Sequence, residues 1–99
     1  CAQHAWLSPL PPEGASALRY RTTARGAEIA AAQGIRSLDL LRDGVVDRIV
    51  AERPDAADEP AAFLARLAQV LEYELVGLLR RPTAERRAAR LDRYARLGC

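Results

Sequence analysis

The feature that most constrains this chain is a run of apolar residues, spaced three and four apart, between Pro60 and Pro82. Its members are Phe63, Leu64, Leu67, Val70, Leu71, Leu75 and Leu78. Because an α-helix turns once every 3.6 residues, this spacing places the seven side chains in one stripe. The run therefore predicts a helix over residues 60–80, with Leu67 and Leu71 buried in a core.

A second amphipathic helix is expected after Pro82, with Thr83 as its cap. Its predicted inner face carries Ala84, Ala88, Leu91, Tyr94, Ala95 and Leu97, and its outer face carries Arg86, Arg87, Arg90, Arg93 and Arg96. Residues 80–99 hold seven Arg against two acids, a net charge of +5, whereas residues 51–79 hold six acids against two Arg, a net charge of −4. Aromatic residues for stacking on bases are not interleaved with these arginines, so a solvated or subunit-facing surface is favoured over a nucleic-acid site.

The first half of the chain predicts shorter elements. In order, they are an edge strand near residues 5–10, a helix from Pro11-Pro12-Glu13, a helix capped by Thr22 or Thr23 and stopped by Gly34, a helix from an N-cap at Ser37 to Gly44, and a strand at Val45–Val50. Aromatic residues make up only 5% of the chain, and Ala and Leu dominate it. The predicted fold class is α/β, mostly helical with one or two short strands.

Several classes of function are excluded by what the sequence lacks. No apolar run is long enough to span a membrane, no glycine-rich phosphate loop occurs, and His4 is the only imidazole. Cys1 and Cys99 do not have zinc-site spacing, so we expect no metal site and reduced thiols. The acids at 55, 58 and 59 are explained as charges at a helix N-terminus rather than as a catalytic pair.

Ninety-nine residues with a net charge of +2 allow one domain and do not indicate a polyanionic partner. Because neither a start Met nor a signal segment is present, we expect part of a longer, cytoplasmic polypeptide. From the residues alone, the interpretation stops at a small α/β piece with a helical tail. Two other functions stay open: a helical protein–protein interaction module that uses residues 60–80, and, less favoured, an Arg-rich nucleic-acid binder that uses residues 80–96.

Several short sequence segments indicate more about the chain than its residue patterns do when they are read residue by residue. They are Pro12-Glu13-Gly14-Ala15-Ser16, Ala27-Glu28-Ile29-Ala30-Ala31-Ala32-Gln33-Gly34-Ile35, Asp39-Leu40-Leu41-Arg42-Asp43-Gly44-Val45-Val46-Asp47-Arg48-Ile49-Val50, Asp55-Ala56-Ala57-Asp58-Glu59-Pro60 and Leu91-Asp92-Arg93-Tyr94-Ala95-Arg96-Leu97-Gly98. Together, in one order from about Ala5 to Gly98, they resemble the C-terminal part of the carboxyltransferase of bacterial acetyl-CoA carboxylase, the α-subunit half. Each segment alone is weak, but the ordered set is fairly specific.

The resemblance implies a crotonase-like fold, built from stacked strand–strand–helix units with a helical C-terminal region. Residues 1–53 would form the end of the crotonase-like core, and residues 54–99 would form a C-terminal region of two helices. The segment around Gly44-Val45-Val46-Asp47 resembles the helix–turn–strand that crotonase relatives share.

The resemblance also implies an activity. In the family, a carboxyl group passes from carboxybiotin, held on a carrier protein, to the methyl carbon of acetyl-CoA and gives malonyl-CoA. The family's glycine-rich oxyanion loops lie upstream of the matched part, so we expect no catalytic residue in this chain and no activity from the chain alone. Only Glu13, Gly14 and Ala15 are expected beside the substrate site.

The same resemblance implies which partners this chain has. They are the rest of the carboxyltransferase or its β-type half, a biotin carboxyl carrier protein and an acyl-CoA, within a homo- or hetero-oligomer. Carboxybiotin is the implied cofactor and is not attached to this chain. No membrane partner is expected, and the resemblance disfavours a nucleic-acid partner.

Overall fold

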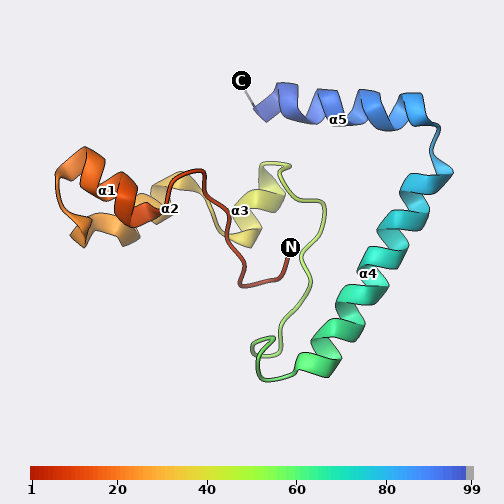
Figure 1. Ribbon diagram of the computed structural model, residues 1–99, viewed down its shortest axis with the longest axis horizontal. Coiled ribbons are helices and arrows are strands. Elements are labelled where there is room, and N and C mark those ends of the chain that lie inside the picture. Colours follow the sequence, from red (N-terminus) through yellow and green to blue (C-terminus); the bar gives the residue numbers. More distant parts are fainter. Residues whose placement is uncertain (98–99) are drawn as a thin grey trace.

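The computed structural model describes residues 1–97 and is helical along most of that length (Figure 1). The elements are α1 (Pro12–Tyr20), the 3-10 turn η1 (Thr23–Arg25), α2 (Gly26–Gln33), α3 (Ser37–Arg42), α4 (Pro60–Arg80) and α5 (Thr83–Leu97). The helix predicted over residues 60–80 is confirmed at both ends. The last helix includes Thr83 as its first residue, whereas Thr83 was predicted to be its cap. Two prolines explain the limits of α4, because Pro60 occupies its first turn and Pro82 follows its end.

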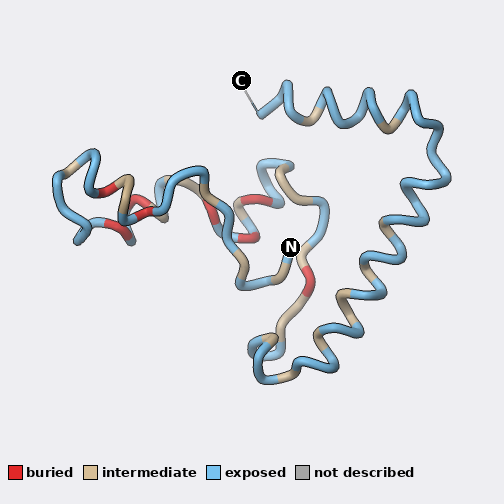
Figure 2. The backbone as a smooth tube through the Cα atoms, viewed as in Figure 1, coloured by how far each residue is buried: buried red, intermediate tan, exposed pale blue. Residues whose placement is uncertain are grey.

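The N-terminal half contains the core. Its four buried apolar side chains are Ile29, Ile35, Leu40 and Val50. Figure 2 shows the buried positions gathered in α1, α2, α3 and the segment after them, whereas α4 and α5 carry none. The predicted division of the chain near residue 53 stays a prediction, although the core does end at Val50.

Ser16 and Gly34 hold the α1–α2 hairpin in shape. The Ser16 side chain is fully buried, and its hydroxyl donates to the Thr22 carbonyl and accepts from the Arg25 backbone N–H. Gly34 has a φ of 62°, the left-handed conformation that ends a helix and favours glycine. The predicted stop of this helix at Gly34 is therefore confirmed.

No strand forms among residues 1–97, so the predicted strands at residues 5–10 and Val45–Val50 are wrong. Between residues 1 and 97, only two isolated bridges are present, Ala2 with Val50 in parallel and Trp6 with Arg36 in antiparallel orientation. The reason is the hydrogen bonding of the backbone. The N–H groups of Val45 and Val46 donate to the Leu40 carbonyl at the end of α3, which leaves them unable to enter a ladder.

Two predicted caps also differ from the structure. Ser37 is the first residue of α3 rather than its N-cap, and its buried hydroxyl donates to the Gln3 carbonyl at 2.6 Å. The Thr22 hydroxyl accepts from the Ala24 N–H and so caps η1 rather than α2. In both cases the hydroxyl group makes a hydrogen bond that the sequence pattern did not predict.

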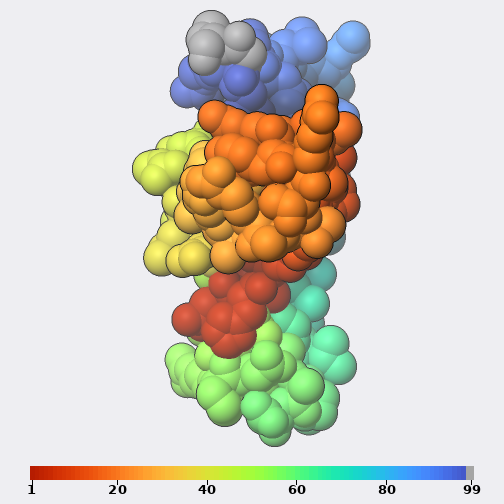
Figure 3. Space-filling model, turned by 90° about the vertical axis from the view of Figure 1, so that its left-hand side faces the viewer, coloured from red at the N-terminus to blue at the C-terminus, as the bar shows by residue number. Residues whose placement is uncertain are grey.

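α4 and α5 spread the chain into a thin, open shape. Its extents are 50 × 38 × 16 Å, and its radius of gyration is 16.8 Å, whereas a compact chain of this length has about 13 Å. Figure 3 shows the narrow profile, with α5 above the N-terminal helices and the turn before α4 below them. The open shape leaves Leu67 half-buried and Leu71 52% exposed, so the predicted burial of both in a core is wrong.

The inner face predicted for α5 is not buried, and only two of the five arginines predicted on its outer face differ from that prediction. Leu91 and Tyr94, expected inside, are exposed, whereas Arg86 and Arg93, expected outside, are half-buried. The physical reason is that α5 approaches the rest of the chain through an ion pair of Arg93 and not through apolar contact. Within residues 1–97, no helix is both long and apolar enough to cross a membrane.

Candidate functional site

A hollow of about 600 Å³ lies beside the start of α1. Its wall comes from the N-terminal segment, α1, α2 and the residues before α3, and includes His4, Trp6, Pro12, Glu13, Gly26 and Arg36. A volume of this size is within the range of small-molecule sites. The hollow is thus the place where the predicted site residues can be assessed.

The three predicted site residues share one turn of α1 but do not share one environment. Glu13 is exposed and lines the hollow, whereas Gly14 and Ala15 are half-buried and do not line it. A Cβ at Gly26 would lie 3.4 Å from Glu13 Cγ, so the missing side chain lets α2 approach the start of α1 closely. The structure therefore brings Glu13 to the hollow and leaves Gly14 and Ala15 in a packing role.

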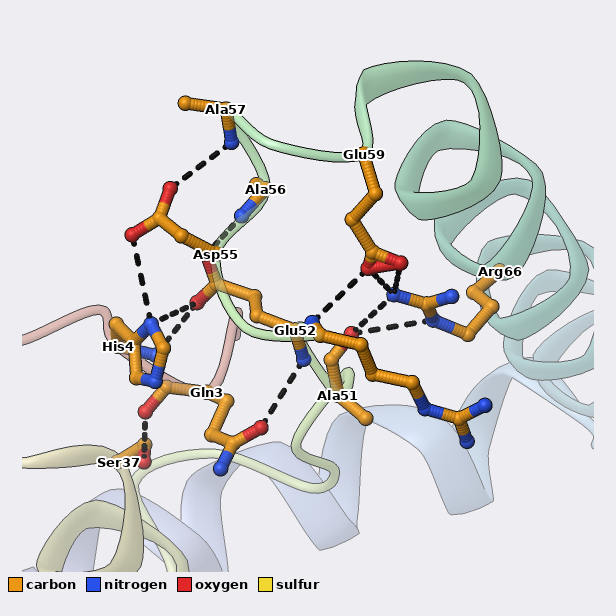
Figure 4. Close-up of polar contacts among 11 residues, drawn as sticks. Gln3, His4, Ser37, Ala51, Glu52, Asp55, Ala56, Ala57, Glu59 and Arg66 are labelled. Carbon is orange, nitrogen blue, oxygen red and sulfur yellow. Dashed lines mark hydrogen bonds and ion pairs between the residues drawn. The ribbon is translucent and has the colours of Figure 1, made fainter.

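A second group of side chains, the N-terminal clasp, joins His4 to Glu52 and Asp55 (Figure 4). His4 Nδ1 lies 3.4 Å from a Glu52 carboxylate oxygen and 3.6 Å from an Asp55 carboxylate oxygen. The Glu52 side chain is only 6% exposed, and its oxygens accept the backbone N–H groups of His4 and Ala56 at 2.6 and 2.9 Å. The clasp therefore ties the first residues of the chain to the segment before α4.

The clasp consists of donor types that metals use, since imidazole nitrogen and carboxylate oxygen are both zinc ligands. The sequence predicted no metal ligands, because no local spacing links His4 with residues 48 or more positions away. The carboxylates already satisfy backbone donors: Asp55 Oδ1 accepts the Ala57 N–H at 2.9 Å. These contacts explain the three residues of the clasp as a structural connection between the N-terminal segment and the segment before α4.

Arg66 anchors the first turns of α4, a role that sequence reasoning missed. Its Nε and Nη2 donate to the Ala51 carbonyl at 3.1 and 2.9 Å, and Nη2 also pairs with the Glu59 carboxylate (Figure 4). Glu59 accepts the Arg53 backbone N–H at 2.9 Å as well. The hydrogen bond from Arg66 lowers the pKa of Glu59 from its ordinary value, despite the opposing effect of desolvation.

A larger hollow, of about 1230 Å³, separates the segment 45–50 from α4 and α5. Valines and leucines from that segment and from α4 line it, together with Arg48, Arg86, Arg90 and Arg93. Arg48 crosses it to pair with Glu74, and its guanidinium lies 4.7 Å from the centre of the Tyr73 ring. The hollow is thus bridged by charged side chains and is not filled by apolar packing.

The arginines of α5 do not form one free basic surface. Arg93 pairs with Asp47, Arg96 pairs with Asp92 at 3.0 Å, and Arg86 donates to the Thr83 hydroxyl at 3.0 Å. The hydrogen bond from Arg93 lowers the pKa of Asp47 from its ordinary value. These pairings weaken the interpretation of α5 as a phosphate-binding helix.

Comparison with known proteins gives a consistent result along the chain. Residues 1–98 match the family described as acetyl co-enzyme A carboxylase carboxyltransferase-like. The chain is 59% identical, over 97 residues, to the probable biotin-dependent acyl-coenzyme A carboxylase beta3 subunit of Mycobacterium tuberculosis. The aligned residues make up 98% of this chain and 20% of that protein.

Two further relatives are acetyl-coenzyme A carboxylase carboxyl transferase α subunits. That of Rhizorhabdus wittichii is 38% identical and that of Phenylobacterium zucineum is 34% identical, each over 97% of this chain. The chain covers 31% and 30% of those two proteins. It therefore spans between about a fifth and a third of the length of the curated relatives that it matches.

Proposed function

The chain belongs to the acetyl-CoA carboxylase carboxyltransferase-like family, and on that premise we propose that it forms the C-terminal part of a biotin-dependent acyl-CoA carboxyltransferase. The observation that carries the proposal is the family match over residues 1–98, which leaves almost none of the chain outside it. The relatives are named as carboxylase or carboxyl transferase subunits, which supports a role as part of such an enzyme.

The proposed reaction moves a carboxyl group from carboxybiotin, on a carrier protein, to acetyl-CoA, and yields malonyl-CoA for fatty acid biosynthesis in the cytoplasm. An acyl-CoA substrate is supported by the names of both groups of relatives, and acetyl-CoA by the name of the α subunits. The carrier protein and the other half of the carboxyltransferase are the proposed partners, within an oligomer.

We assign no residue of this chain to binding carboxybiotin. The hollow beside α1 presents the carboxylate of Glu13, which makes no ion pair within residues 1–97. Arg36 lines the same hollow, so Glu13 is not its only charged group. Stabilisation of the reacting oxygens is proposed to come from backbone N–H groups elsewhere in the enzyme, and the chain alone is proposed to be inactive.

The role proposed for Glu13, Gly14 and Ala15 is to support the substrate site from beside it. Glu13 lies at the hollow, and the close approach of Gly26 to its side chain fixes the start of α1 against α2. A displaced α1 start would move whatever part of the enzyme lies against the hollow. These residues are thus proposed as positioning residues.

A segment exchange tests the function. The matching fifth of the Mycobacterium tuberculosis beta3 subunit is replaced by this chain, and carboxyl transfer to acetyl-CoA and to a longer acyl-CoA is compared with that of the parent protein. We expect the chimera to retain the activity and acyl-CoA preference of the parent. A folded chimera without transfer activity would contradict the proposal.

Variants within the chimera test the positioning role. Gly26→Val pushes a side chain against Glu13, so we expect KM for the acyl-CoA or kcat to change, whereas Gly77→Ala, where a Cβ meets nothing within 4 Å, should leave both unchanged. If Gly26→Val leaves both constants unaltered in a folded chimera, the start of α1 has no positioning role.

A helical interaction module is the second candidate, and one observation favours it. α4 exposes Leu64, Leu71, Leu75 and Leu79, and residues of this kind gathered on one element mark a protein interface. The segment exchange separates the two candidates, because an interaction module from an unrelated system would not sustain carboxyl transfer.

A further inference from the structure

The N-terminal clasp brings together three side chains that can each bind a metal ion. They are His4, from the N-terminal segment, and Glu52 and Asp55, from the segment that precedes α4 (Figure 4). One nitrogen of the imidazole and one oxygen of each carboxylate all lie within 4.8 Å of one another. Imidazole nitrogen and carboxylate oxygen are both ligands of divalent transition metals, zinc among them. The clasp therefore has the donor set of a three-residue metal site.

The distances within the clasp suit a metal ion better than direct hydrogen bonds. His4 Nδ1 lies 3.4 Å from a Glu52 oxygen and 3.6 Å from an Asp55 oxygen, whereas an N–H···O hydrogen bond measures about 2.7–3.2 Å. Among residues 1–97, His4 forms a hydrogen bond through its backbone N–H and not through its ring. Two ligands of a tetrahedral zinc ion, each about 2.0–2.2 Å from the metal, lie about 3.3–3.6 Å apart. The two measured distances match that separation.

The buried charge of Glu52 is a second, independent observation. Its side chain is only 6% exposed, and within residues 1–97 no arginine pairs with it. Burying a carboxylate is costly unless a positive charge compensates it. A protonated His4 would supply one positive charge against two carboxylates, since Asp55 faces the same imidazole nitrogen. A divalent cation balances both carboxylates and leaves His4 neutral, which is the form in which imidazole binds metals.

Backbone hydrogen bonds hold both carboxylates in position and leave oxygen lone pairs for a metal. In each carboxylate, the oxygen farther from the imidazole accepts a backbone N–H at 2.9 Å, from Ala56 for Glu52 and from Ala57 for Asp55. The Glu52 oxygen near the imidazole accepts only the His4 backbone N–H and retains a second lone pair. Hydrogen bonds of this kind orient the ligands of metal sites. His4 and Asp55 are about half exposed, so a water molecule can reach a fourth coordination position.

We propose that His4, Glu52 and Asp55 bind one zinc ion, with a water molecule as its fourth ligand. Three protein ligands and one water form a coordination sphere that zinc uses in proteins. Residue spacing alone predicted no metal site, because Glu52 lies 48 positions after His4. The bound ion joins the N-terminal segment, which forms part of the wall of the hollow beside α1, to the segment before α4. This inference goes beyond the carboxyltransferase function, since these side chains take no part in the proposed reaction.

Calorimetric titration with zinc tests the site. The 99-residue chain carries Cys1→Ser and Cys99→Ser in every sample, because a thiolate is itself a zinc ligand. We expect one zinc ion to bind per chain. His4→Ala and Asp55→Asn should each weaken binding about tenfold or more, because each removes a ligand. Asp58→Asn removes the same charge from an exposed position of the same segment, so it is the matched control and should leave the affinity unchanged.

Thermal unfolding gives a second measurement that does not depend on the heat of binding. Zinc at about a hundredfold excess over its Kd should raise the unfolding midpoint by about 5 °C or more, because it binds the folded clasp only. Magnesium at the same concentration should raise it less, because magnesium prefers oxygen ligands and retains its water. Circular dichroism checks that each variant keeps its helices.

Four results would overturn the proposal. Absence of zinc binding at millimolar zinc would mean that the clasp closes without a metal. A loss of affinity in His4→Ala but not in Asp55→Asn would mean that zinc binds outside the clasp. Equal weakening by Asp58→Asn, or equal responses to zinc and magnesium, would mean that the acidic segment attracts cations in general. The segment exchange described above reports on the enzymatic function separately, so failure of one proposal is distinguishable from failure of the other.

Discussion

At the scale of single residues, buried polar groups do more to define this fold than large apolar side chains. Ser16 is fully buried, and its hydroxyl connects the Thr22 carbonyl with the Arg25 N–H, while the buried Ser37 hydroxyl holds the Gln3 carbonyl. Apart from Pro12, only four apolar side chains are buried in the described residues. Small hydroxyl side chains therefore carry contacts between segments that a larger core would otherwise supply.

Ser16→Ala is expected to lower the free energy of unfolding by about 1–3 kcal/mol, because it removes two part-buried hydrogen bonds, each worth about 0.5–1.5 kcal/mol. Urea unfolding followed by circular dichroism measures the change. Thr23→Ala, at an exposed position in the same loop, is the control and should change it by less than about 0.5 kcal/mol. Equal effects of the two substitutions would mean that the Ser16 hydroxyl is not a structural contact.

Three carboxylates, those of Asp43, Asp47 and Glu59, are expected to make stability depend on pH in the acid range. Hydrogen bonds from Arg93 and Arg66 lower the pKa values of Asp47 and Glu59 in the folded chain. A carboxyl group with a lowered folded pKa stabilises the fold above its unfolded pKa, about 3.9 for Asp and 4.3 for Glu, and this stabilisation is lost as the pH falls through the folded value. Stability should therefore decline as the pH falls below about 4.

Unfolding midpoints at pH 7 and pH 3 measure this dependence in wild type, in Asp47→Asn with Glu59→Gln, and in the control Asp58→Asn. The double variant should lose part of the pH dependence, because Asp43 keeps the lowered pKa that the hydrogen bond from Arg42 gives it, and the control should retain all of it. The Asp47–Arg93 pair is solvent-exposed, so its own contribution is small, about 0–1 kcal/mol. A double variant as pH-dependent as wild type would show that other groups are responsible.

At the scale of elements, the helices are defined by their ends. α2 stops where Gly34 adopts a φ of 62°, and α4 begins and ends beside prolines. Arg66 then fixes the first turns of α4 to the Ala51 carbonyl and to Glu59. Each element is thus positioned by one or two specific contacts at its ends and not by a continuous packed face.

Two glycine substitutions with opposite expected signs test this view. Gly34→Ala should destabilise the fold by about 1–2 kcal/mol, because a Cβ strains the left-handed conformation. Gly77→Ala, within α4, should stabilise it by about 0.5–1 kcal/mol, because alanine loses less backbone freedom in a helix and its Cβ meets nothing within 4 Å. Thermal unfolding measures both, and a change of the same sign in both variants would contradict the argument.

At the scale of the whole molecule, the open shape follows from where the contacts lie. The core ends at Val50, and α4 and α5 are tied to it by the pairs Arg48–Glu74 and Arg93–Asp47. Long exposed apolar surfaces remain on both helices. Such surfaces are consistent with a chain that belongs to a larger enzyme.

The helices and their ends could be predicted from the sequence by itself, because helix hydrogen bonds join residues four positions apart. The limits of α4 and the stop at Gly34 could therefore be predicted. The family could be predicted as well, because the resemblance depends on the order of short segments. The position of Glu13 beside a hollow could be predicted only in part. The sequence located the turn that carries Glu13, but not the segments that pack around it.

The tertiary structure alone decided which distant residues meet. Val45–Val50 has the composition of a strand, yet its first N–H groups bond to α3 and no neighbouring strand is present within residues 1–97. His4 reaches Glu52 across 48 positions, and Leu71 is exposed although its spacing is that of a core residue. A strand, a side-chain cluster and a buried face each need a partner distant in sequence, and local residue patterns do not specify that partner.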